Sequence, residues 1–295
     1  MTTSRFPKLP PERPGHPASP ELQARRESLA AAIDAGKYRT SPLPIESVLN
    51  GVRLLHFATK HDSRTAVIHF HGGAFRLGNP EMIGPFAAAL SARCNVEVIC
   101  PDYRLAPEYP LPAALHDGVK TIDALLNTGY TNLIISGDSA GGGLATSLIA
   151  LCIAAGIHVT GLVLMSPWLD LTLTSDCYAT NAATDLLFSH QAAADAAQLY
   201  LQGVSAENPL ASPLSGSVAG FPPTLISVGS GEVLASDGER FHLKLQRAGV
   251  TSHFIAIAGM EHVAVTRGMQ LPGAAETFDV ITKFIDASLE RSSAR

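Results

Sequence analysis

Short runs of apolar residues recur along the chain, and stretches long enough for a helix separate most of them. A continuous apolar run of about four to eight residues is typical of a strand that is buried on both faces of a sheet. The predicted buried strands are 66–70, 96–100, 133–136, 162–165, 224–228 and 254–257. The helix-length stretches include 82–92, 113–128 and 238–248. This alternation predicts right-handed crossovers between parallel strands, so we expect an α/β fold with a mostly parallel, twisted sheet and helices on both faces.

The N-terminal part of the chain has a different pattern. Residues 1–18 contain five prolines, which exclude regular structure and indicate an extended arm. A helix is predicted to begin after Ser19, a favourable N-cap residue, and to stop at Gly36. Two short strands are predicted within 45–57, on either side of Asn50-Gly51, which is typical of a two-residue hairpin turn. The sheet is therefore expected to begin with an antiparallel pair.

One long segment interrupts the alternation of strands and helices. Residues 171–221 contain one clear helix, around 189–201, and a turn-rich stretch with two prolines at 208–213. An insertion of about fifty residues is more often a lid or cap than a bare loop. We expect this segment to cover one end of the sheet.

Composition narrows the class of protein. The chain has 295 residues, of which 46% are hydrophobic, so it can bury the core of one large α/β domain with an accessory piece. The net charge of −5 comes without a basic run of the kind that nucleic acids or anionic membranes require, and it fits small neutral substrates. The N-terminus lacks the apolar core of a signal peptide, and no apolar run suits a membrane span. We expect a cytoplasmic protein.

The strongest chemical signal is the pattern G-x-S-x-G at 137–141, with Ser139 at its centre. It lies between the apolar run 132–136 and a long stretch of small and apolar residues, 142–151, that predicts a helix. In a strand–turn–helix context this pattern is a nucleophile elbow, because the glycines permit the tight turn that holds the serine hydroxyl clear of the sheet. The helix also aims its free N–H groups at any anion formed there. Ser139 is the predicted nucleophile.

A histidine must activate this serine, and its place in the chain is restricted. In such folds the order is serine, acid, histidine, each at the carboxyl end of a strand. Three histidines come late enough: His242, His253 and His262. His242 falls inside a predicted helix and His253 at the start of a strand, whereas His262 follows the last strand directly. His262 is the predicted base.

The acid is expected after the strand that precedes the histidine. Glu232, Asp237 and Glu239 follow that strand, and Glu232 is nearest its end. Asp237 and Glu239 open the next helix, where N-terminal capping already explains a carboxylate. We prefer Glu232, keep Asp237 as the alternative, and place Asp170 third because a loop-capping role explains it better. The preferred acid would orient His262 and stabilise its charged form.

Adjacent glycines directly after a strand, at Gly72 and Gly73, predict an anion site. Without side chains in the way, backbone N–H groups there can point into a concavity, as an anionic tetrahedral intermediate requires. The N–H groups of Gly72, Gly73 or Ala74 are expected to form an oxyanion hole together with that of Ala140, the residue after the nucleophile.

With these residues placed, the chain resembles the α/β-hydrolase fold, and within it the hormone-sensitive-lipase-like (family IV) carboxylesterases, from about Arg64 to Lys283. The motifs that carry the resemblance are 71–75, 102–108, 137–141, 166–170 and 259–262. Two positions depart from the family pattern. Ala74 stands where a third glycine is usual, and Glu232 stands where the family commonly has an aspartate. The resemblance also implies that His71 and the stretch 102–108 are structural.

The resemblance implies a serine esterase that needs no metal or cofactor and favours short acyl chains. It also implies a cap built from two segments, so we expect 1–44 to be an arm and helix that contribute to the cap, 171–221 to be the cap insertion, and 45–170 with 222–295 to be the hydrolase core. Expected partners are a small ester substrate, with no nucleic acid and no stable membrane insertion, and a homodimer is compatible with this reading. An amidase, a carbamate hydrolase or an acyltransferase could use the same residues. A non-catalytic small-molecule receptor is less favoured, because Ser139, the acid candidate and His262 are all present.

Overall fold

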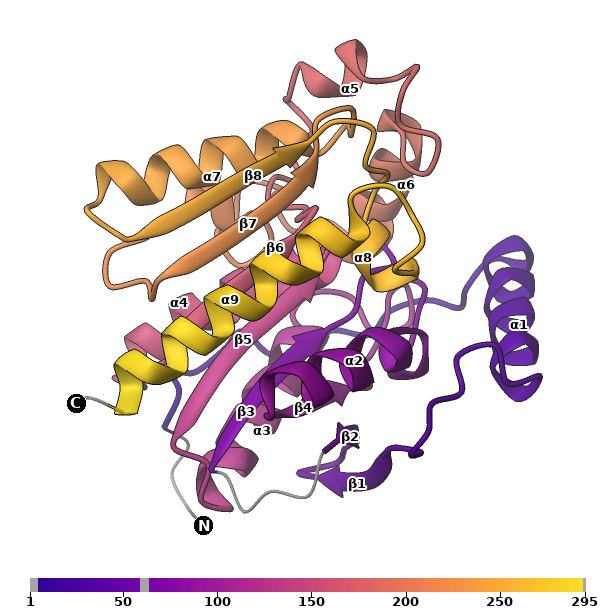
Figure 1. The fold of residues 1–295 in the computed structure, drawn as a ribbon. Helices are drawn as coiled ribbons and strands as arrows, with labels where there is room; N and C mark the ends of the chain where they lie inside the picture. Colours follow the sequence, from indigo (N-terminus) through magenta and orange to yellow (C-terminus); the bar gives the residue numbers. More distant parts are fainter. Residues whose placement is uncertain (1–4, 59–63, 294–295) are drawn as a thin grey trace.

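A computed structural model describes residues 5–58 and 64–293, and an eight-stranded sheet runs through its centre (Figure 1). The strands are β1 (Ile45–Leu49), β2 (Val52–Phe57), β3 (Thr65–Phe70), β4 (Glu97–Pro101), β5 (Asn132–Asp138), β6 (Gly161–Met165), β7 (Thr224–Gly229) and β8 (Ser252–Ile257). Their order across the sheet is β1-β2-β4-β3-β5-β6-β7-β8. β1, β2 and β4 pair antiparallel, and all other neighbours are parallel. The predicted mostly parallel sheet with an antiparallel start is confirmed.

The hairpin turn shows why the sheet begins this way. Leu49 pairs with Val52, which leaves Asn50 and Gly51 as the two turn residues. Both have positive φ, 50° and 81°, the backbone conformation that a tight hairpin needs and that asparagine and glycine adopt readily.

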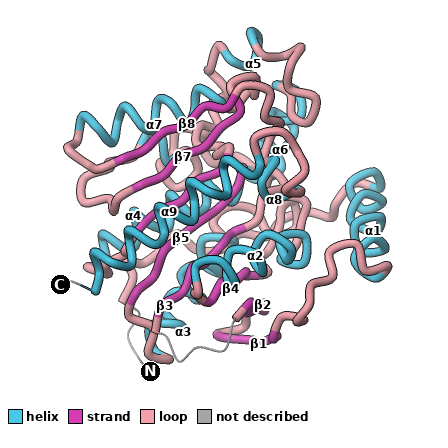
Figure 2. Tube along the Cα trace, in the orientation of Figure 1, coloured by secondary structure: helices cyan, strands magenta, loops and turns pink. Residues whose placement is uncertain are grey.

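Helices cover both faces of the sheet (Figure 2). They are α1 (Pro20–Asp34), α2 (Gly84–Cys94), α3 (Ala113–Asn127), α4 (Ala140–Ala154), α5 (Cys177–Thr180), α6 (His190–Leu201), α7 (Ala235–Arg247), α8 (Ala264–Arg267) and α9 (Ala274–Ser293), with short 3-10 turns η1 (Pro80–Ile83) and η2 (Pro213–Ser215). One apolar cluster joins α3, α4 and α7 to the sheet, and the other joins α2 and α9 to the opposite face. Alternate strand residues separate between the clusters, for example Ile68 into the first and Val67 into the second. This two-sided burial explains why the strands read as continuous apolar runs.

Two helices differ from the sequence prediction. The stretch predicted as one helix over 82–92 begins as the 3-10 turn η1, and α2 starts at Gly84, with a proline in its first turn. The helix predicted from 238 starts earlier, at Ala235. The final helix α9 was not among the predicted elements. Among the described residues, no helix combines the length and apolarity needed to cross a membrane.

The N-terminal helix α1 begins as predicted, since the Ser19 hydroxyl accepts a hydrogen bond from the N–H of Leu22 at 3.2 Å. Leu22 is its one fully buried side chain among those described. A polar anchor holds the helix instead: Arg26 donates to Glu108 at 2.7 Å, to the carbonyl of Ala106 at 2.7 Å and to the carbonyl of Arg76 at 3.0 Å. Thus α1 is tied to the loops at the carboxyl ends of the strands rather than buried on the core.

The segment 171–221 lies over the same end of the molecule, where α5 and α6 stand above the sheet (Figure 1). On α6, Tyr200 stacks against Phe75 with ring centroids 3.9 Å apart. Arg13 in the N-terminal arm donates to the carbonyl of Leu201 at 2.8 Å. Both N-terminal segments and the insertion therefore surround the sheet edge at which ligands bind in this class of fold.

Candidate active site

Ser139 occupies a sharp turn between β5 and α4. Its backbone has φ 51° and ψ −122°, a sparsely populated conformation for a residue with a side chain, which costs of the order of 1–3 kcal/mol. The two flanking glycines make this turn feasible: a Cβ on Gly137 would collide with the carbonyl of Gly141, and one on Gly141 would collide with the carbonyl of Phe70. The strand, turn and helix predicted around Ser139 are present.

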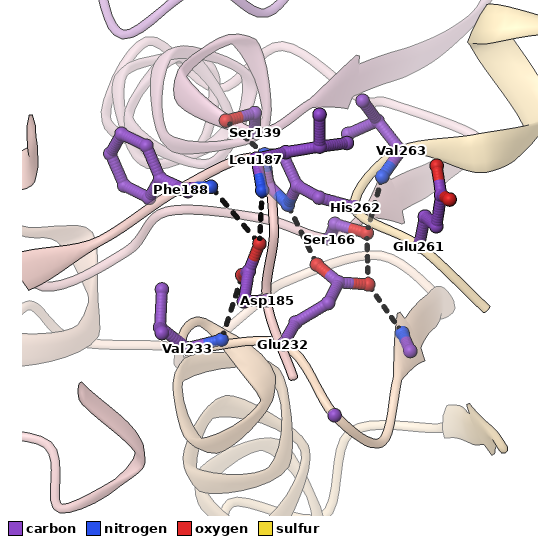
Figure 3. Close-up of polar contacts among 12 residues, drawn as sticks. Ser139, Ser166, Asp185, Leu187, Phe188, Glu232, Val233, Glu261, His262 and Val263 are labelled. Atoms are coloured by element: carbon purple, nitrogen blue, oxygen red, sulfur yellow. Dashed lines mark hydrogen bonds and ion pairs between the residues drawn. The ribbon is translucent and has the colours of Figure 1, made fainter. Parts of the chain in front are cut away.

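A chain of hydrogen bonds links Ser139 to two residues that are distant in the sequence (Figure 3). His262 Nε2 lies 3.0 Å from Ser139 Oγ, and His262 Nδ1 lies 2.7 Å from Glu232 Oε2. All three side chains are buried, with Glu232 only 1% exposed. Burial by itself lowers the pKa of His262, but the hydrogen bond and the negative charge of Glu232 outweigh it and raise that pKa above its ordinary value. His262 is therefore well placed to accept a proton, and Glu232 is well placed to stabilise the resulting charge.

The Glu232 carboxylate is held on its far side as well. Its Oε1 accepts from the Ser166 hydroxyl at 2.8 Å and from the N–H of Gly229. The Ser166 hydroxyl oxygen in turn accepts from the N–H of Val263 at 3.1 Å. Ser166 thus joins the acid to the residue after the histidine (Figure 3). Sequence reasoning assigned it no role, although its place directly after β6, at the same sheet edge, was a usable signal.

The other acid candidates lie elsewhere. Asp237 accepts from the N–H groups of Leu169 at 2.8 Å and Asp170 at 3.0 Å, and burial raises its pKa to about 7. Asp170 binds Thr172 and the guanidinium of Arg240. Within the described residues, neither carboxylate forms a hydrogen bond or ion pair with His262.

The remaining candidates are also explained by their surroundings. Glu239 is exposed on α7. His242 stacks on Phe254, and His253 packs against Phe284.

The loop after β3 presents its backbone toward Ser139. Of the predicted anion donors, Gly72 already donates its N–H to Asp138 Oδ1 at 3.0 Å. Gly73 and Ala74 have φ of 120° and 55°. Among the hydrogen bonds of the described residues, none uses the N–H groups of Gly73, Ala74 or Ala140. These three amides are free to face an anion.

The cap insertion contacts the histidine directly. Phe188 stacks flat on His262, with ring centroids 5.9 Å apart and an interplanar angle of 9°. Asp185 accepts from the N–H groups of Leu187 and Phe188, both at 3.0 Å, and from the N–H of Val233 at 2.9 Å (Figure 3). Asp185 therefore ties the insertion to the loop that carries Glu232. The sequence offered no signal for this residue, because its partners lie in a remote loop.

A cavity of about 570 Å³ opens beside Ser139. Its lining includes most of the loop 71–77, Phe188 and His262, together with residues from α1, η1, α6 and α8 and the turns that follow α1 and α8. Small-molecule sites commonly have volumes of about 300–1,000 Å³, so the cavity suits a small organic substrate.

The family resemblance implied a structural role for His71 and the stretch 102–108, and both make contacts that support the surrounding loops. His71 is buried and stacks on Tyr103 at 4.4 Å, and the Tyr103 hydroxyl donates to the His71 carbonyl at 2.7 Å. In the stretch 102–108, Arg104 binds Asp117 at 2.8 Å. These contacts brace the loops behind the cavity.

Comparison with known proteins shows the family to which the chain belongs. The model of an α/β-hydrolase-fold family matches residues 67–266, and the chain belongs to this family. Within it, the chain is hormone-sensitive-lipase-like: it matches a crystal structure of an esterase from the bacterial hormone-sensitive lipase family with a TM-score of 0.81 and 27% identity, over 92% of this chain and 99% of that one. The family resemblance predicted from the sequence is confirmed.

Two curated relatives are also similar over most of the chain. An esterase of Acinetobacter venetianus is 39% identical over 216 residues, which is 72% of this chain and 71% of the relative. An acetyl-hydrolase of Streptomyces hygroscopicus is 31% identical over 274 residues, which is 92% of this chain and 91% of the relative.

Proposed function

We propose that the chain is a serine carboxylester hydrolase that uses Ser139 as nucleophile, His262 as general base and acid, and Glu232 as the acid that orients His262. The observation that carries this proposal is the buried hydrogen-bond chain from Ser139 through His262 to Glu232 at the edge of a cavity. Relatives named esterase and acetyl-hydrolase support carboxylester hydrolysis.

The positions of Ser139, His262 and Glu232 support the following acylation step. Ser139 Oγ attacks the ester carbonyl carbon while its proton passes to His262 Nε2, 3.0 Å away. The carbonyl oxygen becomes an oxyanion, for which the N–H groups of Gly73, Ala74 and Ala140 are available. Glu232 stabilises the charged imidazole through Nδ1. His262 then gives the proton to the leaving alcohol, and an acyl-serine remains.

Deacylation repeats these steps with water. His262 takes a proton from a water molecule, the resulting hydroxide attacks the acyl carbonyl, and the same amides accept the oxyanion. The proton returns to Ser139 as the carboxylic acid leaves. Residues 171–221 and 1–44 would act as the cap that limits substrate size, and the cavity of about 570 Å³ supports a preference for short acyl chains.

The test is Ser139→Ala, assayed with 4-nitrophenyl acetate and butyrate. Loss of such a serine typically lowers turnover by about 10⁶-fold, so the variant should show no enzymatic hydrolysis. Ser217→Ala, which changes an exposed serine in a surface turn, is the matched control and should retain activity. A fluorophosphonate probe should label the wild-type chain and the Ser217 variant but not the Ser139 variant. Hydrolysis that persists in Ser139→Ala would refute the proposal.

A further inference from the structure

The cavity beside Ser139 is rich in positive charge, although the whole chain has a net charge of −5. Four of its lining residues are cationic: Arg25, Lys37, Arg76 and Arg267. Among the described lining residues the one carboxylate is Asp138. Asp138 Oδ1 is already bound by His69 at 3.1 Å and by the N–H of Gly72 at 3.0 Å. The cavity therefore differs in charge from the protein as a whole.

The four cations are not equally neutralised. Arg267 lies 2.7 Å from Glu261 Oε2 and forms an ion pair. The Lys37 ammonium group lies 5.4 Å from the centroid of the Tyr38 ring. The Arg76 guanidinium donates a hydrogen bond to the carbonyl of Ala192 at 3.3 Å. Within the described part of the chain, neither Arg76 nor Arg25 forms an ion pair with a carboxylate.

Arg76 belongs to the loop that carries two of the proposed anion donors and lines the same cavity as Ser139. It follows the free amides of Gly73 and Ala74 in the same loop, and its own N–H donates to the carbonyl of Gly73 at 3.1 Å. Arg26 holds its carbonyl at 3.0 Å. Hydrogen bonds therefore hold both the N–H and the carbonyl of Arg76. Its half-buried side chain lines the cavity, and within the described residues it forms no ion pair with a carboxylate.

The electrostatic surroundings favour an added anion. Burial lowers the pKa of the Arg76 guanidinium, and the nearby charge of Arg25 lowers that pKa further, while Asp195 opposes both. The group stays charged, because an arginine does not lose its proton in proteins. Two neighbouring guanidinium groups without a bound carboxylate repel each other, and an anion between them removes that repulsion.

We propose that Arg76 and Arg25 bind a carboxylate of the substrate, so that the enzyme prefers esters that carry a carboxylate over neutral esters. The guanidinium fork matches a carboxylate with two parallel hydrogen bonds, which gives both strength and orientation. This inference rests on the proposed function, because the bound ester must still present its carbonyl to Ser139. It differs from the expectation of small neutral substrates that the overall composition suggested, and the substrate pairs below distinguish the two.

Two matched substrate pairs test the inference. For a carboxylate on the alcohol part, the pair is 4-acetoxybenzoate and its methyl ester. For a carboxylate on the acyl part, the pair is mono(4-nitrophenyl) adipate and 4-nitrophenyl methyl adipate. For each pair the measured quantity is the anionic-to-neutral ratio of kcat/KM, which is compared between variants so that intrinsic differences in reactivity cancel.

In at least one pair, Arg76→Gln should lower this ratio by about 10- to 100-fold, the loss expected for a hydrogen-bonded ion pair. Arg76→Lys, which keeps the charge without the fork, should give an intermediate ratio. Arg25→Gln, at an exposed position on α1, should lower the ratio by a smaller factor. Added salt should reduce the wild-type ratio, because ions screen the attraction.

The matched control is Arg247→Gln, which removes an exposed positive charge at the end of α7, away from the cavity lining, and should leave both ratios unchanged. Thermal unfolding of each variant checks that it is folded. If the wild-type chain hydrolyses the neutral esters and neither Arg76→Gln nor Arg25→Gln changes either ratio, the anion site is refuted while the esterase proposal stands. If the wild-type chain hydrolyses none of the four esters, both proposals fail.

Discussion

Exchanging Glu232 for glutamine reverses the hydrogen-bonding character of one position next to His262. Glu232 Oε1 accepts from the Ser166 hydroxyl and the Gly229 N–H, so in Glu232→Gln the amide oxygen is held at this position. The amide NH₂ group must then face Nδ1 of His262. The imidazole can accept that hydrogen bond only if it carries its proton on Nε2. Nε2 would then have no lone pair for the Ser139 hydroxyl.

The size of the effect follows from what the carboxylate does. Its Oε2 lies 2.7 Å from His262 Nδ1 in a buried site, where it selects the tautomer and stabilises the charged ring. The same carboxylate-to-amide exchange in a serine-protease triad lowers kcat by about 10⁴-fold. We therefore expect kcat/KM to fall by about 10³- to 10⁴-fold in Glu232→Gln, or about 4 to 5.5 kcal/mol in transition-state stabilisation.

The assay is hydrolysis of 4-nitrophenyl butyrate, with thermal unfolding as a measure of folding. Glu232→Asp keeps an acceptor for Nδ1 and should lose less activity than Glu232→Gln. Asp237→Asn is the matched control, because this buried carboxylate hydrogen-bonds backbone amides on a different loop. A folded Glu232→Gln enzyme within tenfold of wild-type kcat/KM, or an Asp237→Asn enzyme as impaired as Glu232→Gln, would refute the reasoning.

Two further predictions concern protonation and one concerns packing. Since Glu232 raises the pKa of His262 above its ordinary value of 6.5, the acid limb of the pH profile of kcat/KM should lie above pH 6.5 and move to lower pH in Glu232→Gln. The folded-state pKa of Asp237, about 7, exceeds its ordinary value of 3.8 because of burial, so the folded state holds this proton more tightly and stability should fall as pH rises toward 7. Asp237→Asn should remove that part of the pH dependence of Tm, which lies between the ordinary pKa of 3.8 and the folded-state pKa of about 7. Phe188→Ala removes the ring stacked on His262 and should lower kcat/KM by about tenfold, and its fluorescence should change, because Phe188 also contacts Trp168, the single tryptophan.

The sequence was sufficient for features that depend on local pattern. The strands that are buried on both faces appear as apolar runs, and the turn at Ser139 appears as glycines placed where a side chain would collide with the backbone. His262 could be singled out because only one late histidine follows a strand directly. In each case the deciding information lies within a few neighbouring residues.

Features that depend on distant partners were less accessible. Glu232 and Asp237 both follow the strand β7. Only the coordinates show that Glu232 binds His262, whereas Asp237 accepts from the backbone amides of Leu169 and Asp170. The N–H of Gly72 is taken by Asp138, a residue 66 positions away. The cavity cations come from α1, the turn after it, the loop after β3, and α8, so no basic run marks them in the sequence.

The order of the strands explains why β6, which supplies no proposed catalytic group, is still essential to the site. His262 follows β8, three strands from the β5 end that carries Ser139, a separation of about 14 Å at the usual strand spacing. A histidine side chain cannot span that distance, so the loop after β8 must cross back over β7 and β6. Ser166 directly follows β6 and accepts the N–H of Val263, and it donates to Glu232, which comes from β7. One hydroxyl thus holds both the returning loop and the acid, at the strand that the loop must cross to reach Ser139.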